Sequence, residues 1–191
     1  MARRDEPVDP SRARERVRLE RRFVTSSADA TERLGEALGE RLPPGAVVAL
    51  HGELGSGKTC FVRGLARGLG VREGVASPSF TLMHEYAGRV PVYHLDAWMQ
   101  GRGEAFLEDG GAEWLHAGGV AAVEWAERVG PWLPLPRIAA HLEHQGPERR
   151  RIALALLVDA TGAESQDPLA MRLSAAVRGL EASAGIEEEP T

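Results

Sequence analysis

A single lysine constrains this chain more than any other residue. Among 23 lysine and arginine residues, lysine occurs once, as Lys58, in the segment Gly52-Glu53-Leu54-Gly55-Ser56-Gly57-Lys58-Thr59. The segment fits G-x-x-x-x-G-K-[ST], in which backbone N–H groups surround phosphates and the ammonium reaches the β- and γ-phosphates. A compact ammonium fits that narrow space, whereas a planar guanidinium does not. The residues from Glu53 to Thr59 therefore predict a phosphate-binding loop, and ATP is the nucleotide we expect.

The residues around this loop supply the structural context that the motif needs. Residues 46–50 form a short apolar run typical of a buried strand, and apolar residues recur at helical spacing over residues 61–69. A strand, a glycine loop and a helix in this order direct the positive end of the helix dipole toward the phosphates. Thr59 then offers a hydroxyl where Mg²⁺ is usually bound.

Composition excludes several classes of protein. The net charge of −5 does not suggest a DNA-binding protein, and the single cysteine, Cys60, allows neither an internal disulfide nor a cysteine zinc cluster. No apolar run approaches the roughly 20 residues that span a membrane, and no signal-peptide pattern opens the sequence. We therefore expect a cytoplasmic α/β domain with a sizeable core.

The chain divides into three expected regions. Residues 1–22 hold eight arginines and five acidic residues and predict a flexible tail. Residues 23–158 predict the globular domain, with a helix that is capped by Ser27 or Asp29 and an antiparallel hairpin over residues 137–158 at the edge of the sheet. Residues 159–191 predict an extension with one helix and a frayed acidic end. The expected sheet is mostly parallel and flanked by helices.

Two acidic residues follow predicted buried strands. Asp96 ends Val92-Tyr93-His94-Leu95-Asp96, and Glu124 ends Val120-Ala121-Ala122-Val123-Glu124. Ligands in open α/β sheets lie beyond the carboxyl ends of the strands, so both carboxylates should face the phosphate-binding loop. An acid at the end of a strand holds Mg²⁺ in many nucleotide hydrolases. Asp96 and Glu124 are therefore the candidate metal-binding and catalytic acids.

Other polar and aromatic residues carry weaker signals. Ser77-Pro78-Ser79 lies where nucleotide switches place a hydroxyl that senses the γ-phosphate, but from its residues alone it reads as an ordinary turn. His94 alternates away from Leu95, which favours a packed rather than a catalytic side chain. Trp125 could stack on a base or belong to the core.

Taken together, these blocks resemble the TsaE (YjeE-type) ATPases of bacterial tRNA threonylcarbamoyladenosine biosynthesis. The resemblance runs from about Ser26 to Leu156 and rests on several blocks in the same order: residues 31–38, 51–59, 61–65, 77–82, 93–96 and 123–125. It implies a small Mg²⁺-dependent ATPase with a P-loop fold. It also implies that the chain works with TsaB and TsaD, reaches tRNA indirectly through that complex, and resets the complex by hydrolysing ATP.

The resemblance also implies roles for individual residues. Lys58 contacts the phosphates, Thr59 binds Mg²⁺, Asp96 supports the metal or the attacking water, and Glu124 is a metal-site or water-activating acid beside Trp125. Three departures stand out: Ser79 replaces a threonine, Trp98-Met99 replaces the usual Tyr-Arg pair, and both termini are extended. Arg102 is a candidate substitute for the missing arginine. Arg149, Arg150 and Arg151 resemble basic residues near the nucleotide, without indicating which one points inward.

Three alternative functions use the same kind of loop. A GTPase would need N-K-x-D, and the chain has no asparagine and no second lysine. A small-molecule P-loop kinase usually has an arginine-bearing lid, whereas residues 101–119 contain only Arg102. A nucleotide-gated binding module with negligible turnover stays open, because sequence does not separate it from a slow ATPase that a partner stimulates.

Overall fold

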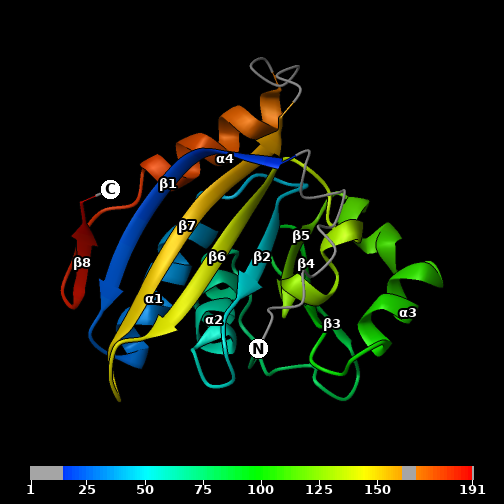
Figure 1. Cartoon of the computed structure of the whole chain (residues 1–191), viewed down its shortest axis with the longest axis horizontal. Coiled ribbons are helices and arrows are strands. Elements are labelled where there is room, and N and C mark those ends of the chain that lie inside the picture. Colours follow the sequence, from blue (N-terminus) through cyan, green and yellow to red (C-terminus); the bar gives the residue numbers. More distant parts are fainter. Residues whose placement is uncertain (1–14, 161–166, 191) are drawn as a thin grey trace, which may run out of the picture.

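A single curved sheet of eight strands organises the molecule (Figure 1). The computed structural model describes residues 15–160 and 167–190. The strands are β1 (Glu15–Thr25), β2 (Val47–His51), β3 (Met83–Ala87), β4 (Pro91–Asp96), β5 (Val120–Glu124), β6 (Arg137–His144), β7 (Arg150–Asp159) and β8 (Ile186–Glu189). The helices are α1 (Ala28–Gly39), α2 (Lys58–Gly68), α3 (Arg102–Glu108) and α4 (Pro168–Arg178), with short 3₁₀ turns η2 (Gly111–His116), η3 (Ala126–Arg128) and η4 (Gly130–Trp132). None of these helices is long and apolar enough to cross a membrane.

The strands follow the order β3-β4-β5-β2-β6-β7-β1-β8. Parallel pairing is confined to β4–β5, β5–β2 and β2–β6, and the remaining neighbours are antiparallel. The α/β architecture that was expected is confirmed, but the description of the sheet as mostly parallel is wrong. The predicted hairpin is β6–β7, and it lies inside the sheet rather than at its edge, because β1 and β8 continue the sheet beyond β7.

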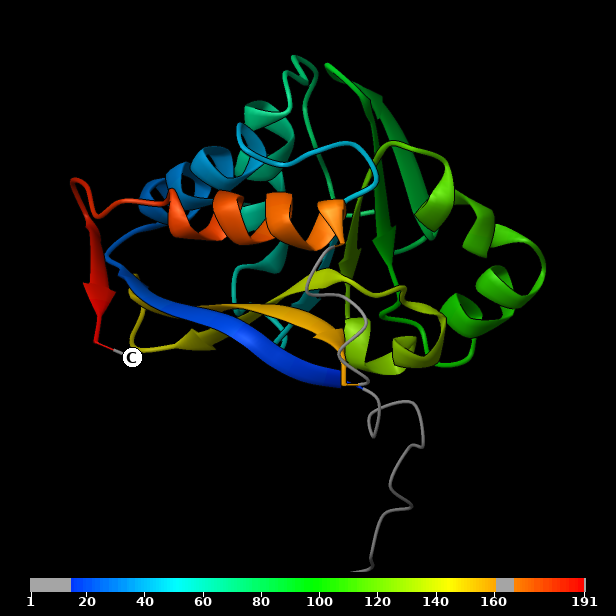
Figure 2. The same cartoon turned by 90° about the horizontal axis from the view of Figure 1, so that it is seen from above.

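Helices cover the sheet in two layers. Helices α1, α2 and α4 lie on one face of the sheet, as both views show (Figures 1 and 2), and they enclose the larger apolar core with Phe23, Leu50 and Leu154. On the other face, α3 and the 3₁₀ turns cover β4, β5 and β2 around a second core that includes Val123 and Leu107. The parallel strands are therefore buried on both sides, which explains their continuous apolar runs.

The predicted N-terminal tail is wrong for residues 15–22. These residues belong to β1, which pairs along its length with β7. The strand is hard to recognise in the sequence because a charged residue, Arg21, lies on the face of β1 that packs against the helices. Its guanidinium is satisfied there by the carbonyl oxygens of Val177, Arg178 and Leu180, at 3.0, 2.9 and 2.6 Å, at the C-terminal end of α4. The rest of the predicted tail, residues 1–14, lies outside the described residues.

The C-terminal region is part of the same fold. The helix predicted there is α4, and Asp167 caps its N-terminus. Its buried side chains, Leu173 and Val177, belong to the larger core. The expected fraying of the acidic end is wrong: Glu187, Glu188 and Glu189 lie in β8, where each carboxylate meets an arginine, namely Arg149, Arg21 and Arg151 respectively. Of these three ion pairs, Arg21–Glu188 joins the neighbouring strands β1 and β8, and opposite charges across neighbouring strands favour their pairing.

Candidate nucleotide-binding site

The loop between β2 and α2 turns through glycines in left-handed conformations. Gly57 immediately precedes α2 and has φ 104°, a left-handed conformation that favours glycine. Lys58 is the first residue of the helix and is 4% exposed. Its Nζ donates to the carbonyl oxygens of Gly52 at 2.7 Å and Glu53 at 2.9 Å, so the lysine folds back over its own loop. The strand, loop and helix predicted from the sequence are thus present.

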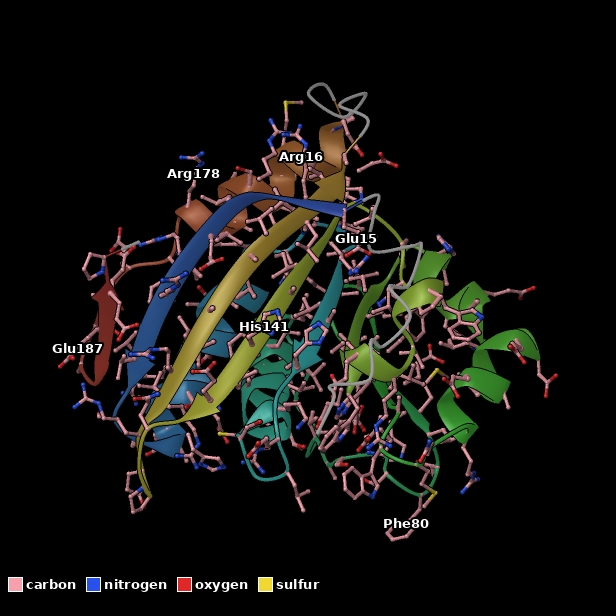
Figure 3. The ribbon with its side chains drawn as sticks, viewed as in Figure 1. Glu15, Arg16, Phe80, His141, Arg178 and Glu187 are labelled. Carbon is pink, nitrogen blue, oxygen red and sulfur yellow. The ribbon has the colours of Figure 1, made fainter. Side chains whose placement is uncertain are left out.

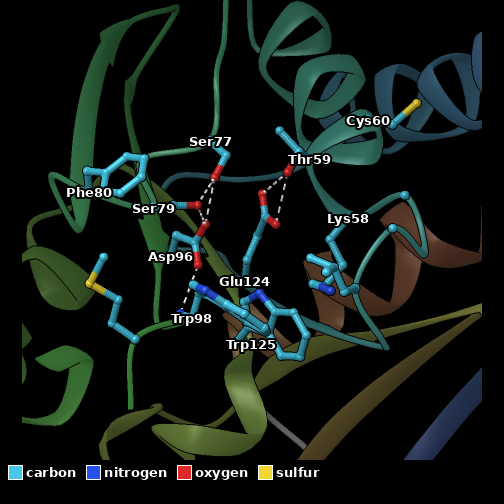
Figure 4. Close-up of a pocket in the computed structure, with 14 residues that line it drawn as sticks. Lys58, Thr59, Cys60, Ser77, Ser79, Phe80, Asp96, Trp98, Glu124 and Trp125 are labelled. Atoms are coloured by element: carbon cyan, nitrogen blue, oxygen red, sulfur yellow. Dashed lines mark hydrogen bonds between the residues drawn. The ribbon is translucent and has the colours of Figure 1, made fainter. Parts of the chain in front are cut away.

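A cavity of about 430 Å³ opens beside this loop (Figure 4). Five loop residues line it, and residues from the ends of β4 and β5 and from the segment before β3 face them. The residues are Leu54, Gly55, Gly57, Lys58, Thr59, Ser77, Ser79, Asp96, Glu124 and Trp125. The predicted loop residues Glu53 and Ser56 do not line the cavity. The tertiary structure therefore gathers the predicted lysine, threonine, carboxylates and serines around one space.

Glu124 and Thr59 contact each other directly. Thr59 Oγ1 donates to the Glu124 carboxylate, at 2.8 Å from Oε1 and 3.0 Å from Oε2. Strand β5 is the parallel neighbour of β2, so the carboxyl end of β5 lies next to the start of α2. Glu124 is 3% exposed, and His94 Nε2 lies 2.9 Å from its Oε1. A carboxylate thus stands against the hydroxyl that was expected to bind Mg²⁺.

Asp96 lies one strand further away and has different partners. Its Oδ2 accepts hydrogen bonds from Ser77 Oγ at 2.6 Å and Ser79 Oγ at 2.7 Å, and its Oδ1 accepts from the Trp98 backbone N–H at 2.9 Å. The serine segment that read as a simple turn is thus tied to the predicted acid. Asp96 pairs in register with Glu124 across β4 and β5, which places the two carboxylates side by side.

Aromatic rings cover the inner side of the site. Lys58 Nζ lies 3.8 Å from the centroid of the Trp125 ring, and the Arg128 guanidinium lies 5.1 Å from that ring and 5.2 Å from the Trp98 ring. Burial lowers the pKa of the Lys58 ammonium, and nearby carboxylates, Glu124 foremost, offset part of this effect. No sequence motif points to Arg128, because its position depends on the turn after β5.

Arg102 and Arg150 lie in different places relative to the phosphate-binding loop. Arg102 lines a separate hollow beside α3 and donates to Met99 Sδ, so it does not line the cavity beside Lys58. Arg150 is the arginine of the 149–151 run that points inward, because its Nε donates to the Ser56 carbonyl oxygen at 3.1 Å. It also lines a hollow of about 320 Å³ on the other side of the loop with Thr31 and Cys60.

The surface around the cavity mouth is apolar. Phe80 is 83% exposed and Leu54 is 72% exposed, and both line the cavity. Figure 3 shows Phe80 pointing away from the ribbon. The same figure shows His141 on the face of the sheet that α1, α2 and α4 leave open, where it stacks on His51 with ring centroids 4.4 Å apart. That histidine pair lies outside the cavity lining.

The α/β sheet, the glycine loop at the start of α2 and the acids at the strand ends define the P-loop class of nucleotide-binding folds. The family model for the threonylcarbamoyl adenosine biosynthesis protein TsaE matches residues 25–152. The chain belongs to the TsaE family.

Individual relatives agree with this assignment. The chain is 42% identical to a tRNA threonylcarbamoyladenosine biosynthesis protein TsaE of Treponema pallidum over 134 residues, which cover 70% of this chain and 99% of that protein. It is 38% identical to the Bacillus subtilis protein of the same name over 133 residues, covering 69% and 82% of the two chains. The crystal structure of Bacillus subtilis YdiB matches with a TM-score of 0.67 and 28% identity, over 84% of this chain and 95% of that one.

Proposed function

We propose that this chain is a Mg²⁺-dependent ATPase that acts as an accessory subunit of the tRNA threonylcarbamoyladenosine machinery. Membership of the TsaE family supports the pathway. The hydrogen bond between Thr59 and Glu124, beside the buried Lys58, is the observation that carries the proposed chemistry. It joins a hydroxyl of the phosphate-binding loop to an acid at the end of the neighbouring strand, which is the pairing that holds Mg²⁺ in P-loop hydrolases.

The residues present fit ATP and Mg²⁺. The oxygens of Thr59, Glu124 and Asp96 are hard donors of the kind that Mg²⁺ prefers. Over residues 15–160 and 167–190, no group of three or more His, Cys, Asp or Glu side chains is arranged to enclose a metal. Mg²⁺ suits such a site, because it usually takes one or two protein oxygens and completes its shell with phosphates and water. When bound, the ion would neutralise charge on the β- and γ-phosphates.

Each side chain then has a defined task. Lys58 turns from the carbonyls of Gly52 and Glu53 toward the phosphates, which are the stronger acceptors. The backbone amides from Glu53 to Thr59 surround the phosphates. Glu124 orients the ion or the attacking water, and Ser79, with Asp96, senses the γ-phosphate. Trp125 lies over Lys58 and excludes water from that side of the ammonium.

The proposed partners are a TsaB–TsaD-like complex and, through it, tRNA, in the cytoplasm. The exposed Phe80 and Leu54 beside the cavity support a partner surface at the nucleotide site, since large exposed apolar residues often mark protein contacts. We expect the isolated chain to hydrolyse ATP slowly and a partner to complete the site. Hydrolysis would then reset the complex between turnovers.

The test is ATP hydrolysis by the purified full chain, with and without a TsaB–TsaD complex from the same source and with Mg²⁺ or EDTA. We expect Mg²⁺-dependent turnover that the complex stimulates strongly. Glu124→Gln should retain ATP binding but lower kcat about 10²–10⁴-fold, the usual contribution of acid–base assistance. Normal turnover by this variant would remove Glu124 from the mechanism. Turnover that appears only with a small phosphate acceptor would instead indicate a kinase.

A further inference from the structure

We propose that His94 is a positioning residue that holds the Glu124 carboxylate in its working orientation. His94 lies on β4, its side chain is fully buried, and its Nε2 is 2.9 Å from Glu124 Oε1. It does not line the cavity, so it acts on a nucleotide only through Glu124. The inference rests on the proposed function, in which Glu124 orients the ion or the water.

The sheet register brings the two residues together. His94 and Asp96 are two residues apart and share one side of β4, and Asp96 pairs with Glu124 on β5. His94 itself pairs with Ala122, whose small side chain leaves the space that the imidazole occupies. The contact therefore joins neighbouring strands that are buried on both faces.

Thr59 and His94 constrain the orientation of the Glu124 carboxylate differently. Thr59 Oγ1 contacts both carboxylate oxygens, at 2.8 and 3.0 Å, and so does not select between them. The terminal torsion of a glutamate is broad, so a carboxylate that is held from one side can rotate. The bond from His94 reaches Oε1 alone. Oε1 then has two partners, whereas Oε2 has only the longer contact with Thr59 and is the oxygen free to turn to an ion or a water in the cavity.

The surroundings of the imidazole define which nitrogen carries the hydrogen. Nδ1 of His94 is buried and has no hydrogen-bond partner among the described residues. A hydrogen on that atom would be a buried, unsatisfied donor, which is costly. Nε2, which faces a carboxylate oxygen, is where a hydrogen gains a partner. His94 therefore donates to Glu124 through Nε2–H and needs no proton on Nδ1.

The first test detects this hydrogen bond directly and does not depend on a measurement of ATP hydrolysis. In ¹⁵N-labelled, nucleotide-free protein, the ring of His94 should show a hydrogen on Nε2 that exchanges slowly with water. Glu124→Ala should shift that resonance and remove the protection. A ring with its hydrogen on Nδ1, or one that does not respond to Glu124→Ala, would overturn the proposal.

The second test separates positioning from packing. His94→Leu replaces the imidazole with an apolar side chain of similar size and removes the Nε2–H donor. We expect kcat to fall about 10–100-fold, as for other groups that orient a metal-site ligand, with an unchanged Kd for ATP. His94→Gln places an amide N–H near the position of Nε2 and should restore most of the lost kcat. His94→Asn has the same amide on a shorter stem and should not.

Controls distinguish this proposal from its premise. His141→Leu makes the same exchange on β6, away from Glu124, and should leave kcat and Kd unchanged. If Glu124→Gln turns over normally, the proposed role of Glu124 fails and the premise of this inference fails with it. If Glu124→Gln is inactive while His94→Leu keeps parental kcat, the positioning role alone fails. Equal activities of His94→Gln and His94→Asn would also overturn the positioning role, and this comparison decides the matter if His94→Leu does not fold.

Discussion

At the scale of single residues, the surroundings of Lys58 explain why arginine does not stand at that position. The ammonium lies between two carbonyl oxygens at 2.7 and 2.9 Å and beneath the Trp125 ring at 3.8 Å. These contacts enclose a compact, rotatable cation on a side chain that is 4% exposed. A guanidinium is planar and needs a wider space with donors in a fixed fork.

Lys58→Arg is therefore expected to bind ATP as poorly as Lys58→Ala, although it keeps the positive charge. Titration calorimetry with ATP and Mg²⁺ measures this directly. If charge alone held the phosphates, Lys58→Arg would bind far better than Lys58→Ala. Arg63→Lys, on the exposed side of α2, is a control that should leave ATP affinity unchanged.

At the scale of elements, the position of the phosphate-binding helix depends on its close approach to α1. Gly64 of α2 faces the α1 backbone, and a Cβ added there would lie 1.8 Å from the Glu32 carbonyl oxygen. Ion pairs of Glu32 with Arg63 and Arg67 lie beside the same contact. Both arginines are 46% exposed, so water screens these pairs and they contribute little; the close packing sets the distance between the two helices.

Gly64→Ala should push α1 and α2 apart and lower the free energy of unfolding by about 1–3 kcal/mol or more, as overpacking does. Urea denaturation followed by circular dichroism gives the value. Gly74→Ala is a matched control, because a Cβ at that position meets no atom within 4 Å. Equal stabilities of the two variants would show that the helices adjust without strain.

At the scale of the whole molecule, both terminal regions are built into the sheet. Strand β1 pairs with β7 on one side and with β8 on the other, and α4 crosses the same strands on the helical face (Figure 2). Residues far apart in the sequence thus close the larger core. The C-terminal region should therefore unfold together with the nucleotide-binding region rather than before it.

Leu173→Ala in α4 should cost about 2–5 kcal/mol, the usual effect of removing a fully buried leucine. Met171→Ala lies on the same helix at a side chain that is 49% exposed, and it should change stability by less than about 0.5 kcal/mol. Thermal unfolding, with ATP-binding activity followed in parallel, tests both. If Leu173→Ala loosened α4 without lowering the unfolding temperature of the nucleotide site, the two regions would be independent.

How much of the sheet could be predicted depended on where the strands lie. Strands β2, β4 and β5 are buried on both faces, and their apolar runs are visible in the sequence. Strands β1 and β8 carry many charged residues. The sheet accommodates them because arginines pair with carboxylates and carbonyl oxygens of segments that are distant in the sequence. No local sequence pattern predicts such pairing. The sequence therefore suggested tails where the structure has strands.

The sequence alone determined the phosphate-binding loop, the order of strand, loop and helix around it, and Asp96 and Glu124 at the ends of buried strands. These features are local, because each depends on residues that are neighbours in the chain. Tertiary structure alone decided that Glu124 contacts Thr59 and His94, that Asp96 contacts the two serines, and that Arg150 rather than Arg149 or Arg151 points inward. Those contacts depend on strand order and register, which are fixed by long-range pairing and core packing.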